Sequence, residues 1–285
     1  MSSHTDTPTR RPLVGVSFKM YFDIPKTKAY LDQTISLLSS THSTPSQPVD
    51  IFVIPDFITL TSVSSQIATS SSPLLLGAQD VHSQDSGAFT GEVSPLVLSQ
   101  AGVKFVEIGH AERRRYFGET DQDVANKAAA ISRNNMIPLI CIGEVSKPNN
   151  INNLSSNDVD KVVEECWRQI QPALQVMEND KHVVLAYEPV WAIGKSEPAS
   201  PEYVVKITKA LRTRYNREYV QTTTNNLDAT AKLRSDASLR ILYGGSAGPG
   251  LFEKIKHGVD GLFLGRFAHN PQAFIDTIKE IAGTN

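Results

Sequence analysis

Eight short apolar runs recur along this chain of 285 residues, and stretches of helical character separate them. The runs span residues 14–18, 51–54, 74–78, 105–108, 137–142, 183–187, 241–243 and 261–264. They are apolar throughout rather than alternating, which is typical of parallel strands buried on both faces of a sheet. The clearest helical stretch, residues 120–134, has Thr120 as a predicted N-cap, acidic residues in its first turn and an alanine-rich interior. Residues 158–178 and 201–219 also have helical character.

Strands that alternate with helices predict a parallel sheet with helical crossover connections, and hence an α/β fold. Eight such units that close on themselves form a (β/α)8 barrel, a fold of typically about 250 residues. The alternative is a doubly wound open sheet, which is disfavoured because no Gly-x-Gly-x-x-Gly segment follows the first run. We therefore expect a single barrel domain over residues 12–285, preceded by a disordered polar tail over residues 1–11.

Composition argues against several classes of function. The net charge of −2 does not indicate a nucleic-acid partner, and no stretch is long and apolar enough to span a membrane. Cys141 and Cys166 are too few for a disulfide framework or a zinc site, and the histidines lack paired ligand spacing. We therefore expect no metal, and the cysteine usage suggests a reducing compartment. The polar N-terminus lacks the apolar core of a secretory signal.

Residues that follow the predicted strands are the candidates for chemistry, because the C-terminal ends of barrel strands build the active site. Lys19, His110 and Glu188 each follow such a run. Each type of residue alone is more often structural or solvated, and Glu188 with Pro189 could simply end a strand at a polar rim. Glycine-containing turns follow the last two strands, the usual place for a phosphate cradle. These turns contain Tyr243, Gly244, Gly245 and Ser246, and then Gly265 and Arg266.

Several stretches resemble the signatures of the triosephosphate isomerase family: EIGHAERRRYFGETD, YEPVWAIG and YGGSAGPG, with FKM near the start and GAFTGEVSP at residues 87–95. The resemblance spans nearly the whole chain, with all eight units in order. It implies the interconversion of dihydroxyacetone phosphate and D-glyceraldehyde 3-phosphate through an enediol, without a cofactor. It further implies a cytoplasmic enzyme of carbohydrate metabolism that acts in glycolysis and gluconeogenesis.

The resemblance also implies a role for each residue. Glu188 would be the base, His110 the neutral electrophile that polarises the carbonyl group, and Lys19 a fixed cation, as in the family itself. Glu112 resembles a residue that pairs with this lysine, and its role is either a stabilising ion pair or a direct part in the chemistry. Substrate and phosphate contacts are expected from Ser17, Gly194, Ser246, Gly265 and Arg266, with glycines allowing the backbone to approach the anion.

Two further segments resemble known parts of the family. One is a lid that would cover the enediolate, with its hinge at Pro189, Val190 and Trp191 and its tip at Ala192, Ile193 and Gly194. The other is GAFTGEVSP, which resembles a loop that these enzymes insert into a neighbouring subunit. A homodimer is implied, with an interface that contains Thr90, Glu92 and Arg113, the last as a possible partner of Glu92.

The sequence departs from the family pattern around the site. Ser17 stands where an Asn is usual, Ala111 where a Ser follows the catalytic His, and Arg266 where a second Gly is usual. The second half of the lid reads KSEPA, in which Pro198 would stiffen one hinge. The guanidinium group of Arg266, which would lie near the phosphate, resembles the pattern of the family branch that isomerises L-erythrulose 1-phosphate.

Three functions therefore stay open. A triose phosphate is the first expectation, a four-carbon ketose phosphate the alternative, and a non-catalytic barrel paralogue the third. A Schiff-base aldolase is disfavoured because none of the predicted runs contains a lysine.

Overall fold

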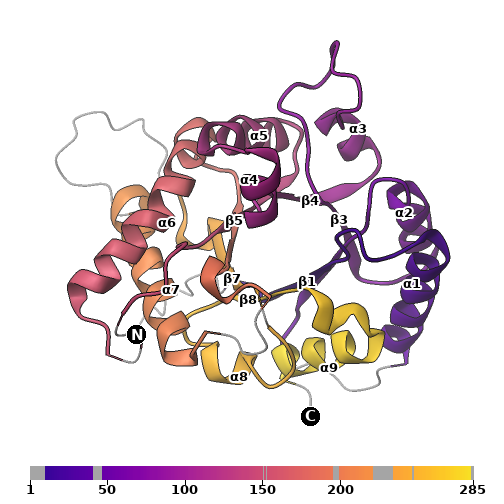
Figure 1. Cartoon of the computed structure of the whole chain (residues 1–285). Helices are drawn as coiled ribbons and strands as arrows, with labels where there is room; N and C mark the ends of the chain where they lie inside the picture. Colours follow the sequence, from indigo (N-terminus) through magenta and orange to yellow (C-terminus); the bar gives the residue numbers. More distant parts are fainter. Residues whose placement is uncertain are drawn as a thin grey trace, which may run out of the picture.

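The eight predicted strands form one closed parallel barrel in the computed structural model, in which β1 pairs with both β2 and β8 (Figure 1). The structure describes residues 10–40, 47–149, 151, 153–194, 199–220, 234–245 and 247–283. The strands are β1 (Leu13–Ser17), β2 (Asp50–Ile54), β3 (Leu74–Ala78), β4 (Val103–Ile108), β5 (Ile137–Ile142), β6 (Val183–Tyr187), β7 (Leu239–Tyr243) and β8 (Gly261–Leu264). The predicted (β/α)8 barrel is confirmed and the open sheet is excluded, because each of these described strands has two neighbours.

Helices cover the outside of the barrel (Figure 1). They are α1 (Ile24–Ser39), α2 (Leu60–Thr69), α3 (Pro95–Gln100), α4 (Ala111–Phe117), α5 (Asp121–Arg133), α6 (Ser156–Val176), α7 (Pro201–Tyr215), α8 (Phe252–Ile255) and α9 (Pro271–Ala282). Short helical turns are η1 (Val190–Ala192), η2 (Asn216–Val220), η3 (Asp236–Ser238) and η4 (Arg266–His269). In the part of the chain that the structure describes, no helix is long and apolar enough to cross a membrane.

Local sequence accounts for the best predicted helix. Thr120 accepts a hydrogen bond from the Asp123 amide, and the Asp123 carboxylate accepts one from the Thr120 amide. This reciprocal capping box satisfies two amides that would otherwise lack partners at the start of α5. The other two predicted helices are found as α6 and α7, and η2 continues α7 as a π-helical turn.

The interior of the barrel is packed with side chains. The Phe52 ring lies between two others, with ring centroids 4.9 Å from Phe105 and 5.9 Å from Phe263. Gly15 makes room for this layer, since a Cβ atom there would lie 2.2 Å from Phe52 Cζ. The pocket described below therefore has a solid floor, and Phe263 is part of its lining.

Strand β4 corrects two of the predictions. The strands are not apolar throughout, because Glu107 lies within β4 and its side chain is buried inside the barrel. β4 also begins at Val103 and so contains Lys104, which the predicted run missed; this residue is exposed, unlike a Schiff-base lysine in a barrel interior. The period-two alternation of strand side chains places Glu107 and Lys104 on opposite faces.

Residues 1–9 of the predicted tail lie outside the described residues. Arg10 Nε lies 2.8 Å from an Asp260 carboxylate oxygen, next to the start of β8. Arg11 Nε lies 3.0 Å from Asp50 Oδ1, at the start of β2. The chain is therefore in contact with the barrel from Arg10 onward.

The packed interior leads to a test by Gly15→Ala. The added methyl group would overlap the Phe52 ring, and overpacking of this kind costs about 1–3 kcal/mol of unfolding free energy. Denaturant unfolding monitored by circular dichroism measures the loss. Gly248→Ala is the matched control, because its Cβ would meet the nearest atom at an ordinary 3.5 Å. Equal stability of the two variants would contradict the description of the interior.

Candidate active site

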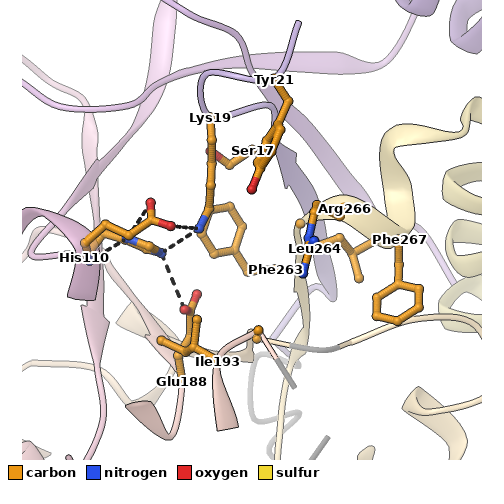
Figure 2. Close-up of a pocket in the computed structure, with 14 residues that line it drawn as sticks. Ser17, Lys19, Tyr21, His110, Glu188, Ile193, Phe263, Leu264, Arg266 and Phe267 are labelled. Atoms are coloured by element: carbon orange, nitrogen blue, oxygen red, sulfur yellow. Dashed lines mark hydrogen bonds and ion pairs between the residues drawn. The ribbon is translucent and has the colours of Figure 1, made fainter. Parts of the chain in front are cut away.

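A cavity of about 580 Å³ opens at the C-terminal ends of the strands. This volume is within the range of small-molecule sites. Figure 2 shows that Lys19, His110 and Glu188 point toward one another on one side of it and that Arg266 lies on the other. The predicted site residues that line it are Ser17, Lys19, His110, Glu112, Glu188, Ile193, Gly194, Gly245, Gly265 and Arg266. Residues that sequence reasoning did not place there are Tyr21, Phe263, Leu264 and Phe267.

Lys19 is held as a cation directly after β1. Its Nζ donates to Glu112 Oε1 at 2.9 Å, so the predicted pairing of these two residues is present. Burial disfavours the ammonium ion, but the hydrogen bond and charge of Glu112, with the charges of Glu188 and Glu107, raise the pKa of Lys19 above its ordinary value. The Lys19 backbone has a φ of 47°, in the left-handed region that side chains disfavour. Such strain at a pocket is typical of a functional position.

His110 is a neutral hydrogen-bond donor. It is the N-cap of α4, and its Nδ1 accepts a hydrogen bond of 3.1 Å from the Glu112 amide. Because Nδ1 is an acceptor, the ring proton is on Nε2, which faces Lys19 and Glu188. Burial and then the charge of Lys19 lower the pKa of His110 to about 4. The imidazole is therefore uncharged at neutral pH and presents an N–H group to the pocket.

Glu188 follows β6 directly and is only 6 % exposed. Its Oε2 lies 3.6 Å from His110 Nε2. Burial raises the pKa of Glu188 to about 7, although the charge of Lys19 opposes the rise. The carboxylate can thus both accept and release a proton near neutral pH, as a general base requires.

Two glycines leave the space that Glu188 occupies. A Cβ atom on Gly244 would lie 2.4 Å from Glu188 Oε1, and one on Gly143 would lie 1.9 Å from the Glu188 carbonyl oxygen. Gly244 was predicted as a supporting residue and Gly143 was not. Neither position accommodates a side chain without displacing the carboxylate or its backbone.

The first part of the predicted lid is a short helical turn, η1, which is hydrogen-bonded to the buried carboxylate of Glu144. Pro189 is the N-cap of η1, and Trp191 Nε1 donates to Glu144 at 2.6 Å. Tyr203 and Tyr187 donate to the same carboxylate at 2.6 and 3.0 Å. Residues 195–198, including Pro198, lie outside the described residues. Beyond them, the Ala199 amide donates to the Tyr243 hydroxyl group at 3.1 Å, which gives Tyr243 a supporting contact.

The backbone around the far side of the pocket suits an anion. Gly194 and Gly245 have φ angles of 74° and 81°, which favour glycine, and Gly265 is the N-cap of η4. Arg266 begins η4 and its side chain borders the cavity. Ser246, which was also predicted to bind phosphate, lies outside the described residues.

The predicted interface residues lie away from this lining. Thr90 and Glu92 are exposed on the segment between β3 and α3, which stands out from the barrel (Figure 1). Arg113 donates to Asp80 of the same chain, with 2.7 Å between Nη2 and Oδ2. An intersubunit contact of Arg113 with Glu92 stays a prediction.

Comparison with known proteins places this chain in a family. A family profile described as triosephosphate isomerase matches residues 12–281. The chain belongs to the triosephosphate isomerase family. An L-erythrulose-1-phosphate isomerase of Pectobacterium atrosepticum is 42% identical over 93% of this chain and 94% of its own. A triosephosphate isomerase of Thermoanaerobacter pseudethanolicus is 34% identical over 90% and 94%, and an L-erythrulose-1-phosphate isomerase of Rhizobium etli is 34% identical over 94% and 92%.

The chain is therefore an isomerase of this family, and relatives under two substrate names match it over most of its length. Within the described residues, no group of three or more His, Cys, Asp or Glu side chains is placed to hold a metal ion.

Sequence reasoning missed two buried carboxylates near the pocket of this isomerase. Glu107 lies inside β4 and Glu144 follows β5. A glutamate within an otherwise apolar run was the available signal for Glu107. Glu144 follows Gly143 after a buried strand, and nothing local indicates that aromatic donors from β6, η1 and α7 converge on it.

The raised pKa of Glu188 predicts a stability cost. Burial in the folded protein raises the pKa of this carboxyl group from 4.5 to about 7, because it disfavours the ionised form. The stability that the neutral group contributes is therefore present at low pH and is lost as the pH rises through 7. Glu188→Gln should therefore be more stable than the native isomerase at about pH 8, by up to about 3 kcal/mol, with little difference at about pH 4.5. Urea unfolding at both pH values measures this. Glu178→Gln, which removes a side chain that is 76% exposed, is the control, and a gain independent of pH would contradict the assignment.

Proposed function

We propose that the chain interconverts a small ketose phosphate and its aldose phosphate through an enediol, with Glu188 as the base and His110 as the electrophile. The observation that carries this proposal is the convergence of a basic carboxylate and two donors. Glu188 Oε2 lies 3.6 Å from His110 Nε2, which in turn lies 3.4 Å from Lys19 Nζ. His110 Nε2 and Lys19 Nζ are both donors, so neither satisfies the other, and together they suit one substrate oxygen atom.

Each group has a defined step in this mechanism. Glu188 removes the proton from the carbon next to the carbonyl group, and the electron pair of that C–H bond forms the C=C bond of the enediol. The carbonyl oxygen takes up the displaced electron pair, and the His110 N–H group and the Lys19 ammonium ion stabilise its charge. His110 then gives its Nε2 proton to the original carbonyl oxygen and takes up the proton of the neighbouring hydroxyl group, so the hydroxyl proton changes oxygen atoms. Glu188 returns the carbon-bound proton to the former carbonyl carbon, and the second oxygen becomes the new carbonyl group without a net change of oxidation state.

The phosphate group would be bound on the opposite side of the pocket. The backbone at Gly194, Gly245 and Gly265 would approach the anion, with Ser246 as a further expected donor. Arg266 would add a cation there, and the segment from Pro189 to Gly194 would close over the intermediate.

For the substrate, we propose a four-carbon ketose phosphate such as L-erythrulose 1-phosphate ahead of dihydroxyacetone phosphate, which was the first expectation from the sequence. Three observations support the longer sugar. Ser17 is shorter than the usual Asn, Arg266 borders the pocket, and a relative named for this substrate is 42% identical. The 34% identical triosephosphate isomerase keeps the triose open.

Activity assays test the proposal directly. Isomerisation of L-erythrulose 1-phosphate and of D-glyceraldehyde 3-phosphate should be measured side by side, and the four-carbon sugar should have the higher kcat/KM. Glu188→Gln should lower turnover about 10²–10⁴-fold because the base is lost, while Glu178→Gln should not. A preference for the triose would restore the first expectation. Turnover of neither sugar would favour the non-catalytic paralogue.

We further propose a cytoplasmic homodimer that uses the segment around Thr90 and Glu92, with sugar-phosphate metabolism as its role and no cofactor. Phe89, in the same segment, is partly exposed, as expected of a contact with another subunit. Analytical ultracentrifugation should give a dimer mass for the native chain and a smaller mass for Thr90→Arg, which would place a bulky charge in the contact. A native monomer would contradict this proposal and leave the chemistry untouched.

A further inference from the structure

The carboxyl group of Glu107 connects the interior of the barrel with the pocket. It belongs to β4 but contacts β1, which is not a neighbour of β4 in the sheet, so the contact crosses the barrel interior. Glu107 is 4 % exposed, and its Oε2 lies 3.0 Å from Ser17 Oγ. Its Oε1 lies 4.0 Å from Cys141 Sγ of β5. Ser17 belongs to the pocket lining although it is only 2 % exposed, so a buried acid lies directly behind a residue of the pocket wall.

We propose that Glu107 is a positioning residue which, as a neutral acid, donates its proton to Ser17 Oγ and so frees the Ser17 hydroxyl proton for an oxygen atom of the substrate. The inference rests on the proposed isomerisation, because it concerns how the same pocket binds its sugar phosphate.

The hydrogen-bonding capacity of Glu107 and Ser17 sets what Ser17 can offer the substrate. A hydroxyl group has one proton to donate and can accept two hydrogen bonds, whereas an ionised carboxylate can only accept. If Glu107 were ionised, its contact with Ser17 would consume the only Ser17 proton, and Ser17 could offer the pocket nothing but a lone pair. A neutral Glu107 can donate instead, and Ser17 then becomes a donor toward the pocket. An oxygen atom that gains negative charge during enolisation needs donors.

The surroundings of Glu107 favour its neutral form. Burial and then the charge of Glu188 raise the pKa of Glu107 to about 8, while Lys19 and the hydrogen bond of Ser17 oppose the rise. The polar groups that face it are Ser17 and Lys19 from β1 and the turn after it, Cys141 from β5, Glu112 from α4 and Glu188 after β6. Burial also raises the pKa of the Cys141 thiol well above its ordinary value, so this group stays neutral in the same range.

The proposed donor function of Ser17 depends on pH through the carboxyl group of Glu107. A raised carboxyl pKa means that the proton, and with it the donor function of Ser17, is present below about pH 8 and is lost above it. Glu188 must be ionised to act as a base, which limits activity below about pH 7. The kcat/KM of the native isomerase should therefore have a narrow maximum between these two apparent values, which belong to the coupled pair of carboxyl groups.

Substitutions at Glu107 and Ser17 test the inference through the pH profile. The native kcat/KM should fall about fivefold between about pH 7.5 and 9, as expected for titration of one group. Glu107→Gln should lose this alkaline limb, because its amide donates to Ser17 at every pH, and should lower kcat/KM only a few-fold near pH 7. Glu107→Leu and Ser17→Ala should lower kcat/KM about tenfold, the usual effect of losing one such hydrogen bond. Glu178→Gln should keep the native profile.

The outcomes separate this inference from the proposed function. If the native enzyme turns over substrate and Glu107→Gln keeps the alkaline fall of kcat/KM, the role of Glu107 alone is overturned. The same holds if Glu107→Gln loses thermal stability while its pH profile of kcat/KM is unchanged. Absence of turnover in the native enzyme would instead overturn the proposed function. Infrared difference spectroscopy then tests Glu107 without activity: the difference between the native enzyme and Glu107→Gln at neutral pH should contain the loss of one protonated carboxyl C=O band, while the band of partly protonated Glu188 remains. Protonated carboxyl bands of unchanged total intensity in this variant would contradict the inference.

Discussion

Closure of the sheet is the constraint on which the rest of this structure depends. Because every strand pairs in parallel with its neighbours and β1 pairs with β8 as well as with β2, all eight strands run in one direction around a single axis and their C-terminal ends meet at one rim. Residues as distant in sequence as Lys19, His110 and Glu188 therefore lie around one cavity. The aromatic layer around Phe52 fills the barrel below that cavity, and Gly15 is needed to make room for it. This packed layer forms the floor of the cavity, and Phe263 belongs to the cavity lining.

Burial at this rim creates a set of coupled protonation states. Glu188 becomes basic because its carboxylate is removed from water, and His110 stays neutral for the same reason. Lys19 keeps its charge because Glu112 pairs with it. Glu188, which titrates near neutral pH, therefore faces His110 and Lys19, which do not change their protonation in that pH range. The native fold accepts a cost in stability to hold an ionisable carboxyl group in this position, a common feature of active sites.

The sequence predicted the barrel and most of the pocket because the signals were local. Strand positions followed from apolar runs, and the start of α5 followed from Thr120 and the acidic residues after it. The catalytic candidates followed from their places directly after strands and from the family resemblance. Glu107 was missed because its environment is not local: the groups that make its burial acceptable come from β1 and β5, far away in the sequence. Glu144 was missed for the same reason, since its donors come from β6, η1 and α7.

The most direct test of the account is whether Glu188 moves a proton of the substrate. L-Erythrulose 1-phosphate and dihydroxyacetone phosphate would each be incubated with the isomerase in deuterated water, and deuterium at the carbon next to the carbonyl group followed by NMR. We expect deuterium to enter this position with the native enzyme, and we expect Glu188→Gln to slow its entry by about 10²–10⁴-fold. Isomerisation with full retention of the original hydrogen, or equal exchange by the variant, would contradict an enediol mechanism with Glu188 as its base.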